Sequence, residues 1–147
     1  MNITQRIRTI LEDLFAGGPL SDCFLIDIAQ NGPRNVTVYI DSDSGVTFEK
    51  CTQVSRHLEK YMDEERIFGG DYVLDVSSPG VDRPLMLWRQ YPRHKGRSLM
   101  VTLKDGTTHE GQLTEIGMDF ISLQKEKAQT LNIPFSEIEK SLVQIRF

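Results

Sequence analysis

The first half of the chain alternates between the apolar spacing of helices and that of strands. Apolar residues recur at intervals of three and four over residues 3–15 and again over 48–62, which predicts two amphipathic helices. Every second residue is apolar in 24–28, 36–40 and 72–76, as in strands with one buried face. The predicted order is helix, strand, strand, helix, strand, with both helices on one face of a sheet. The buried positions expected on the first strand and the second helix are Phe24, Ile26 and Ile28, then Phe48, Cys51, Val54, Leu58 and Met62.

The second half has a different pattern, in which short strands follow one another closely. The alternation Leu99, Val101, Leu103 leads into Asp105-Gly106, a pair typical of tight hairpins. Further strands are expected at 107–116, 120–123, 130–133 and 142–145, with one helical turn at 134–138. Five short strands of this kind predict a small β-barrel. The fold class expected is therefore α+β with two domains, divided into an N-terminal α/β domain at 1–81, a connecting basic helix and linker at 82–94, and the barrel at 95–147.

A sharp turn is expected where these two halves meet, in the sequence Ser-Ser-Pro-Gly-Val-Asp-Arg-Pro at 77–84. Proline followed by glycine suits the two central positions of a type II turn, because glycine accepts the positive φ of the second position. The carboxylate of the next acid can cap a helix, and proline is tolerated in a first helical turn. A structural role is therefore predicted for Ser77, Ser78, Pro79, Gly80, Asp82 and Pro84.

Charge is distributed unevenly along the chain, whose net charge is −4. Residues 1–81 contain 7 Lys or Arg and 13 Asp or Glu, a net charge of −6, whereas residues 82–147 contain 10 and 8, a net charge of +2. No acid occurs between Arg83 and Lys104. Guanidinium groups pair with phosphates and aromatic rings stack on unpaired bases, so this stretch is a candidate contact for RNA. The candidate contact residues are Arg83, Arg89, Arg93, Lys95, Arg97 and Trp88.

The same stretch also has a purely structural interpretation, which the sequence leaves open. It could form a solvated basic helix that pairs with the acidic first domain and buries Leu85 and Trp88 between the domains. For the basic cluster as a whole, contact with a nucleic acid or a protein is favoured over this alternative.

Other classes of function find little support in the residues. No apolar run reaches the about 20 residues that a membrane span needs, and the N-terminus lacks the apolar core of a secretory signal. Cys23 and Cys51 lack metal-site spacing and are expected to be buried thiols in a reducing cytoplasm. The acids of 41–45 suggest a calcium loop, but Thr52 stands where its bidentate Glu belongs. No nucleophile elbow, catalytic triad or phosphate-binding glycine loop is present, so no catalytic, cofactor or metal residue is assigned.

The segment from Tyr72 to Leu85, Tyr-Val-Leu-Asp-Val-Ser-Ser-Pro-Gly-Val-Asp-Arg-Pro-Leu, resembles the signature of the bacterial RimP family of ribosome maturation factors. The resemblance extends to Tyr39-Ile-Asp-Ser, to Gly45-Val-Thr, to Cys51 and Ser55, and to the expected C-terminal barrel, and so covers essentially the whole chain. One departure is Lys50, because the family often has an acid just before the cysteine.

The resemblance implies a KH-like N-terminal domain and a C-terminal barrel of the SH3/Sm type. It implies a cytoplasmic, non-enzymatic assembly factor that binds the free small (30S) ribosomal subunit and promotes its maturation. The partners implied are the rRNA of that subunit and a small-subunit ribosomal protein near the decoding region, with no cofactor, membrane or small-molecule substrate.

Two other functions remain open at this point. The first is an Sm-like regulator that binds free RNA through 111–116 and 119–123, although the alternation there favours plain core and turn positions. The second is an adaptor that binds only proteins through an SH3-like barrel.

Overall fold

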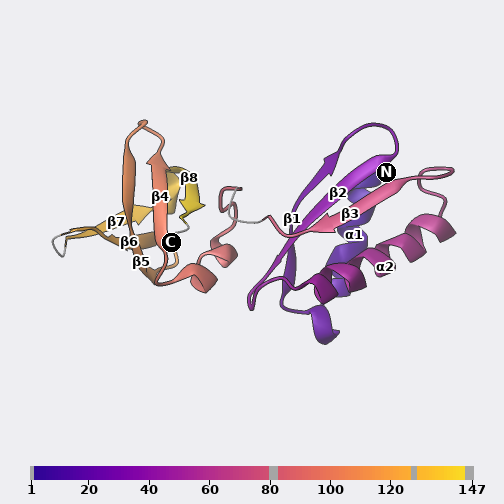
Figure 1. The fold of residues 1–147 in the computed structure, drawn as a ribbon, viewed down its shortest axis with the longest axis horizontal. Coiled ribbons are helices and arrows are strands. Elements are labelled where there is room, and N and C mark those ends of the chain that lie inside the picture. The colour runs from indigo at the N-terminus through magenta and orange to yellow at the C-terminus, as the bar shows by residue number, and fades with distance from the viewer. Residues whose placement is uncertain (1, 80–82, 127–128, 145–147) are drawn as a thin grey trace. The chain divides into compact units, whose positions relative to one another are not determined.

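The chain folds into two compact units, Met1–Pro79 and Gly80–Phe147, in a computed structural model that describes residues 2–79, 83–126 and 129–144 (Figure 1). Each unit has its own hydrophobic core. Within the described residues, no helix combines the length and the apolar character that crossing a membrane would require.

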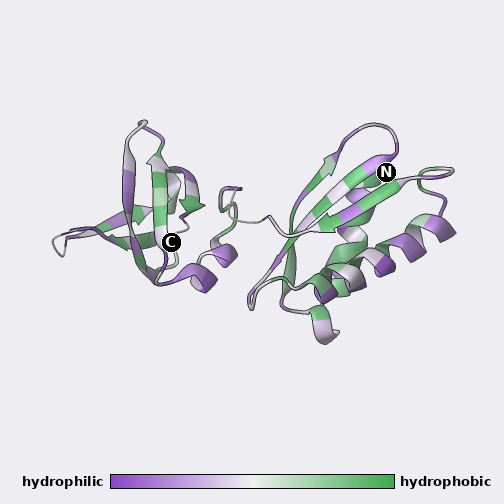
Figure 2. Ribbon diagram, viewed as in Figure 1, coloured by the Kyte–Doolittle hydropathy of each residue, from purple (hydrophilic) through white to green (hydrophobic). Residues whose placement is uncertain are grey.

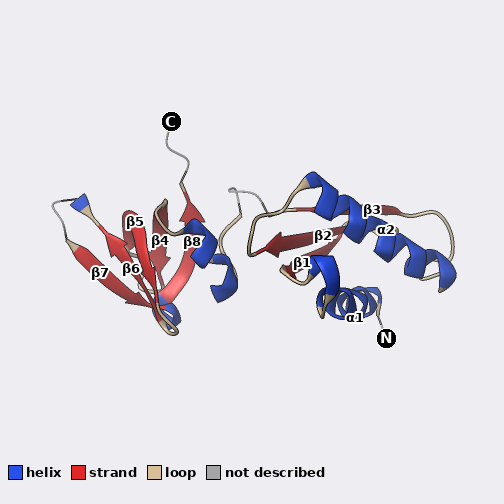
Figure 3. Cartoon of the chain, turned by 90° about the horizontal axis from the view of Figure 1, so that it is seen from below, coloured by secondary structure: helices blue, strands red, loops and turns tan. Residues whose placement is uncertain are grey.

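The first unit is a three-stranded sheet covered by two helices. Its elements are α1 (Ile3–Phe15), a 3₁₀ turn at Gly18–Leu20, β1 (Cys23–Gln30), β2 (Asn35–Ser42), α2 (Phe48–Glu64) and β3 (Val73–Ser77). The sheet order is β1-β2-β3, with β1 and β2 antiparallel and β2 and β3 parallel. Both helices lie on the same face of the sheet (Figures 1 and 3). The predicted order of elements and the single helical layer are confirmed.

Capping and one-sided burial explain why the two helices form where they do. The Asn2 side chain accepts a hydrogen bond from the Gln5 N–H at 2.7 Å, and Thr47 accepts one from the Lys50 N–H at 3.2 Å. Hydrophobic and hydrophilic residues follow each other along both helices (Figure 2). The apolar stripes are buried against the sheet, and the core they form includes Ile7, Ile10, Leu11, Val54, Leu58 and Met62 from the helices and Val36, Val38 and Ile40 from β2.

Phe24 and Ile26 of β1 are buried as expected, but a bulge separates Phe24 from the face that carries Ile28, and the expected burial of Phe48 was wrong. The pairing of β1 with β2 shifts between Leu25 and Asp27, because a β-bulge inserts one extra residue. Leu25 and Ile28 therefore face the helices together, whereas Phe24 lies on the other face. Phe48 was expected in the core, yet its side chain is 89% exposed, since it begins α2 ahead of the first turn that contacts the sheet.

The second unit contains one five-stranded antiparallel sheet. Its strands are β4 (Ser98–Leu103), β5 (Thr108–Ile116), β6 (Phe120–Gln124), β7 (Thr130–Pro134) and β8 (Ile138–Val143), in the order β7-β6-β5-β4-β8. The strands were predicted, although β8 begins four residues before the expected start at 142. The closed barrel was not borne out, because β7 and β8 are the two ends of the sheet and do not pair. A 3₁₀ turn at Phe135–Glu137 connects them instead.

The helix expected to begin near Asp82 is also absent from the described residues. Residues 83–87 have no helical structure, and two 3₁₀ turns follow at Trp88–Gln90 and Pro92–His94. Pro92 explains the break, because proline cannot donate the hydrogen bond that would continue a helix from the first turn. The proposed cap of Asp82 and the turn residue Gly80 lie outside the described residues.

Candidate functional site

Two hydrogen bonds to Ser141 hold the basic segment, residues 83–97, on the sheet of the second unit, and two more within the segment shape its backbone. The Leu85 N–H donates to the Ser141 carbonyl at 2.8 Å, and the Tyr91 hydroxyl donates to Ser141 Oγ at 2.9 Å. The buried Gln90 side chain accepts from the N–H groups of Met86 at 2.7 Å and Leu87 at 2.9 Å. The segment is therefore an ordered part of the unit, with its backbone shaped by a buried amide.

Tyr91 is the main apolar anchor of this segment. Its side chain is 3% exposed and its ring meets that of Phe135 edge to face, with centroids 5.2 Å apart. Burial raises the pKa of the Tyr91 hydroxyl, although the bond to Ser141 acts in the opposite direction. The hydroxyl therefore stays protonated near neutral pH and remains available as a hydrogen-bond donor.

The basic side chains differ in how far they reach into solvent. Arg89, Lys95 and Arg97 are exposed, whereas Arg83 and Arg93 are partly buried. Between Lys95 and Arg97, Gly96 adopts a positive φ of 93° and its N–H donates to the Leu113 carbonyl at 2.7 Å. This turn fixes the backbone of two exposed cations against β5, so a polyanion would meet them on a rigid support.

Trp88 belongs to an apolar groove rather than to an isolated basic patch. Its ring is 47% exposed, and its Nε1–H donates to the Gly117 carbonyl at 2.7 Å. Met86 and Met118 line the same cavity of about 590 Å³, and both are more than half exposed. The ring is accessible to a stacking partner, but its Nε1–H already donates to a backbone carbonyl.

The residues of the turn motif are divided between the two units. Ser77 ends β3 and donates to the Ser78 carbonyl at 3.1 Å, and both serines are exposed. Pro79 ends the first unit, and Pro84 lies partly buried in the second.

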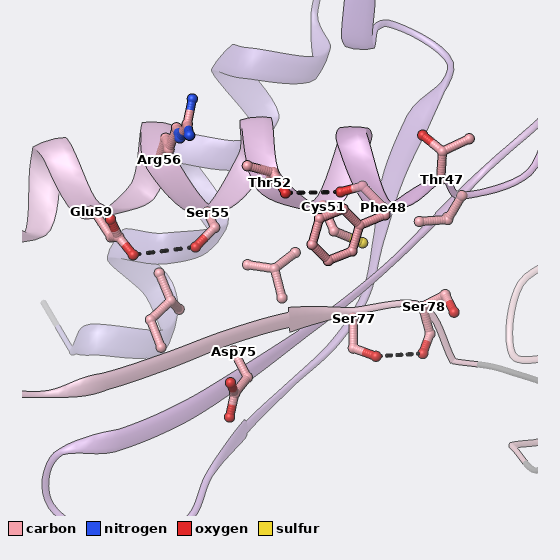
Figure 4. A pocket seen from close by; sticks show the side chains of 13 residues that line it. Thr47, Phe48, Cys51, Thr52, Ser55, Arg56, Glu59, Asp75, Ser77 and Ser78 are labelled. Carbon is pink, nitrogen blue, oxygen red and sulfur yellow. Dashed lines mark hydrogen bonds between the residues drawn. The ribbon is translucent and has the colours of Figure 1, made fainter.

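A second cavity, of about 540 Å³, lies in the first unit between α2 and β3 (Figure 4). Ser77 and Ser78 lie at one end of it, so the turn motif reaches this cavity directly. Cys51 and Ser55, which carry part of the family resemblance, lie on its α2 side (Figure 4). Sequence reasoning did not find this cavity, since its two walls are separated along the chain.

The ammonium group of Lys50 ties α2 to the loop that precedes it. Its Nζ lies 3.1 Å from Asp22 Oδ2, 3.0 Å from Ser42 Oγ, 2.8 Å from Ser44 Oγ and 3.2 Å from the Gly45 carbonyl. The Ser44 hydroxyl and Lys50 together lower the pKa of the Asp22 carboxyl to about 2. A cation of the chain itself thus binds oxygen atoms of Ser42, Ser44 and Gly45, in the loop whose acids suggested calcium.

The thiols and acids of the described residues offer little reactive chemistry. Burial raises the pKa of Cys23 to about 11 and also raises that of Cys51, so both thiols are protonated and weakly nucleophilic. In residues 2–79, 83–126 and 129–144, no three His, Cys, Asp or Glu side chains gather as a metal site would require.

Comparison with known proteins identifies the family. A family model described as the RimP N-terminal domain matches residues 20–82, which include β1, β2, α2 and β3. A protein of Cytophaga hutchinsonii named ribosome maturation factor RimP is 40% identical over 114 residues, covering 75% of this chain and 67% of the relative. The chain belongs to the RimP family of ribosome maturation factors. The resemblance inferred from residues 72–85 is thereby confirmed.

The match to the RimP family model includes residues 77–82 of the turn motif and every residue that lines the α2/β3 cavity, whereas the basic segment follows it. Sequence reasoning identified the basic segment because its residues are consecutive. It missed the anchoring role of Gln90 and the Lys50 cluster, because a single polar residue gives no periodic signal.

Proposed function

We propose that this chain binds the free small (30S) ribosomal subunit in the cytoplasm and promotes its maturation without catalysing a reaction. The observation that carries the proposal is an acid-free basic segment on an ordered backbone, in a chain of the RimP family. The contact residues proposed for rRNA are Arg83, Arg89, Arg93, Lys95, Arg97 and Trp88. They act as phosphate-pairing cations and one ring for stacking.

The remaining parts of the chain receive complementary roles in this proposal. The first unit, with a KH-like arrangement and a net charge of −6, faces a basic small-subunit ribosomal protein near the decoding region. The second unit supplies an SH3/Sm-like scaffold. The functional division follows 1–81, 82–94 and 95–147, and the motif Ser77, Ser78, Pro79, Gly80, Asp82 and Pro84 joins the parts.

Maturation would follow from selective binding. A ligand that binds one conformation of an assembling particle more tightly than the others shifts the population toward that conformation by its difference in affinity. No covalent step is needed.

The first test is sedimentation of the purified protein with free small subunits, large subunits and joined ribosomes. Co-migration with free small subunits alone is the expected result. Failure to bind any ribosomal particle at low salt would contradict the proposal, and binding to free RNA alone would favour the Sm-like regulator. In that alternative Leu113, Ile121 and Leu123 could not contact bases, since each is 0% exposed.

The second test measures subunit affinity against salt for Lys95→Gln/Arg97→Gln. Each lost phosphate contact should reduce the slope of log K against log salt by about 0.7–0.9, so the double variant should lose about 1–2 units. Lys104→Gln is the matched control, because Lys104 is exposed at the opposite end of β4 from Arg97. Equal slopes in all three proteins would refute the rRNA contact, and a subunit complex insensitive to salt would favour the protein-only adaptor.

A further inference from the structure

The strand β3 has an open edge. In the described chain it pairs only with β2, because the sheet order is β1-β2-β3. The Val73 N–H donates to the Arg34 carbonyl at 2.8 Å and so points toward β2. Backbone groups alternate sides along a strand, so the N–H and C=O groups of Leu74 and Val76 point away from β2. Such an edge is a template for one more strand.

The open edge borders the α2/β3 cavity of about 540 Å³, with α2 as the opposite wall. Figure 4 shows the Phe48 ring turned toward the space between the helix and the strand, and Asp75 pointing away from the helix. Phe48 is 89% exposed although it is large and apolar. An extended chain added beside β3 would direct alternate side chains toward Phe48 and the others toward the face that carries Asp75.

The charges around this edge indicate what kind of chain would bind. The charged residues that line the cavity are two acids, Asp75 and Glu59, and one cation, Arg56. The first unit as a whole carries 7 cations against 13 acids. The negative electrostatic potential that results repels a polyanion such as RNA and attracts a basic polypeptide.

We propose that the α2/β3 groove binds an extended, basic segment of a partner protein as a fourth strand beside β3. Backbone bonds from Leu74 and Val76 hold the segment, as in other cases of strand addition. Alternate apolar side chains cover Phe48, and alternate Lys or Arg side chains lie beside Asp75, within the about 5 Å that separates cross-strand neighbours. This inference rests on the protein-binding role proposed above for the first unit, but its test does not depend on ribosomal subunits, so either proposal can fail without the other.

The probe is a labelled nonapeptide of alternating Lys and Val, titrated into the full chain at low salt. Binding is followed by fluorescence anisotropy and by backbone amide NMR signals. The controls are a Glu and Val nonapeptide and a nine-nucleotide oligouridine. The expected result is selective binding of the basic peptide, with signal shifts along β3 and α2. No binding, equal binding of the acidic peptide, or oligouridine binding in this groove would overturn the proposal.

Two single substitutions test the groove without touching the core. Phe48→Ser should weaken peptide binding about fivefold, whereas Met118→Ser should leave it unchanged, because Met118 is a 94% exposed apolar side chain of the other unit. Asp75→Asn should weaken it about threefold at low salt, and the matched Glu12→Gln on α1, which removes the same charge from the unit, should not. If each variant bound the peptide as tightly as its control, the groove would not be the peptide-binding site.

Peptide backbone methylation tests strand addition itself. Methylating every Val amide or every Lys amide removes one of two alternating rows of N–H groups. One set should bind at least about tenfold more weakly while the other is unaffected, and the sensitive set reports the direction of the added strand. Amide exchange at Leu74 and Val76 should be fast in the free protein and slowed by the peptide. Equal binding of both methylated sets would refute a strand beside β3.

Discussion

Replacing Lys50 with Met should destabilise the first unit by about 2 kcal/mol. The ammonium group lies within 3.2 Å of four oxygen acceptors, one of them the carboxylate of Asp22, so charge-assisted bonds are lost. Water can replace part of the loss, because the Lys50 and Asp22 side chains are 20% and 32% exposed. Asp22 also keeps its hydrogen bonds from Ser42 and Ser44. The expected loss of stability is therefore smaller than for a buried charge that loses all of its partners.

Two optical probes separate the units in this experiment. Both α-helices of the described chain lie in the first unit, so far-ultraviolet circular dichroism reports its unfolding, while the single tryptophan, Trp88, reports the second unit. Lys50→Met should lower the dichroism midpoint by about 10 °C and leave the fluorescence midpoint unchanged. The control is Lys60→Met, an exposed lysine on the same helix. If both variants shifted the dichroism midpoint equally, the Lys50 cluster would contribute nothing specific.

The same variant has a defined dependence on pH. The pKa of Asp22 is lowered from 3.8 to about 2 in the folded protein, so its contribution to stability is present above pH 3.8 and is lost as the pH falls through 2. A protonated Asp22 no longer attracts Lys50. The stability difference between wild type and Lys50→Met should therefore narrow between about pH 4 and 2. A difference that stays constant over this window would refute the assigned charge pair.

Two further substitutions test the second unit through the Trp88 fluorescence. Tyr91→Phe removes the hydroxyl that bonds Ser141 Oγ and leaves that buried oxygen without its donor, so the unit should lose about 1–2 kcal/mol while the dichroism midpoint is unchanged. Gly111→Ala would place a Cβ 2.9 Å from a backbone oxygen of β6, and the strand shift required should cost about 1–3 kcal/mol. Thr108→Ala, at an exposed position of β5, is its control, and equal urea midpoints would contradict the close approach.

The candidate site was predictable to the extent that its residues are consecutive. The basic run from Arg83 to Arg97 and the motif at 77–84 are contiguous, so their composition is visible without a fold. The α2/β3 groove was not predictable in this way. It exists because β3 lies at the edge of its sheet and α2 lies beside it, and strand order depends on pairing between distant segments.

The sequence by itself determined the local elements and the family. Capping residues, apolar spacing and the glycine and proline positions act within a few residues, so both α-helices and all eight strands of the described residues were expected near their observed places. The helix expected from Asp82 was the exception. The features that depend on contacts between distant segments were decided only by the tertiary structure. The bulge in β1 places Phe24 and Ile28 on opposite faces. Leu85 and Tyr91 bond to Ser141, about 50 residues further along the chain, and one of the four partners of Lys50, Asp22, lies 28 residues away. Each outcome is a balance of packing and hydrogen bonding between segments that no local pattern encodes.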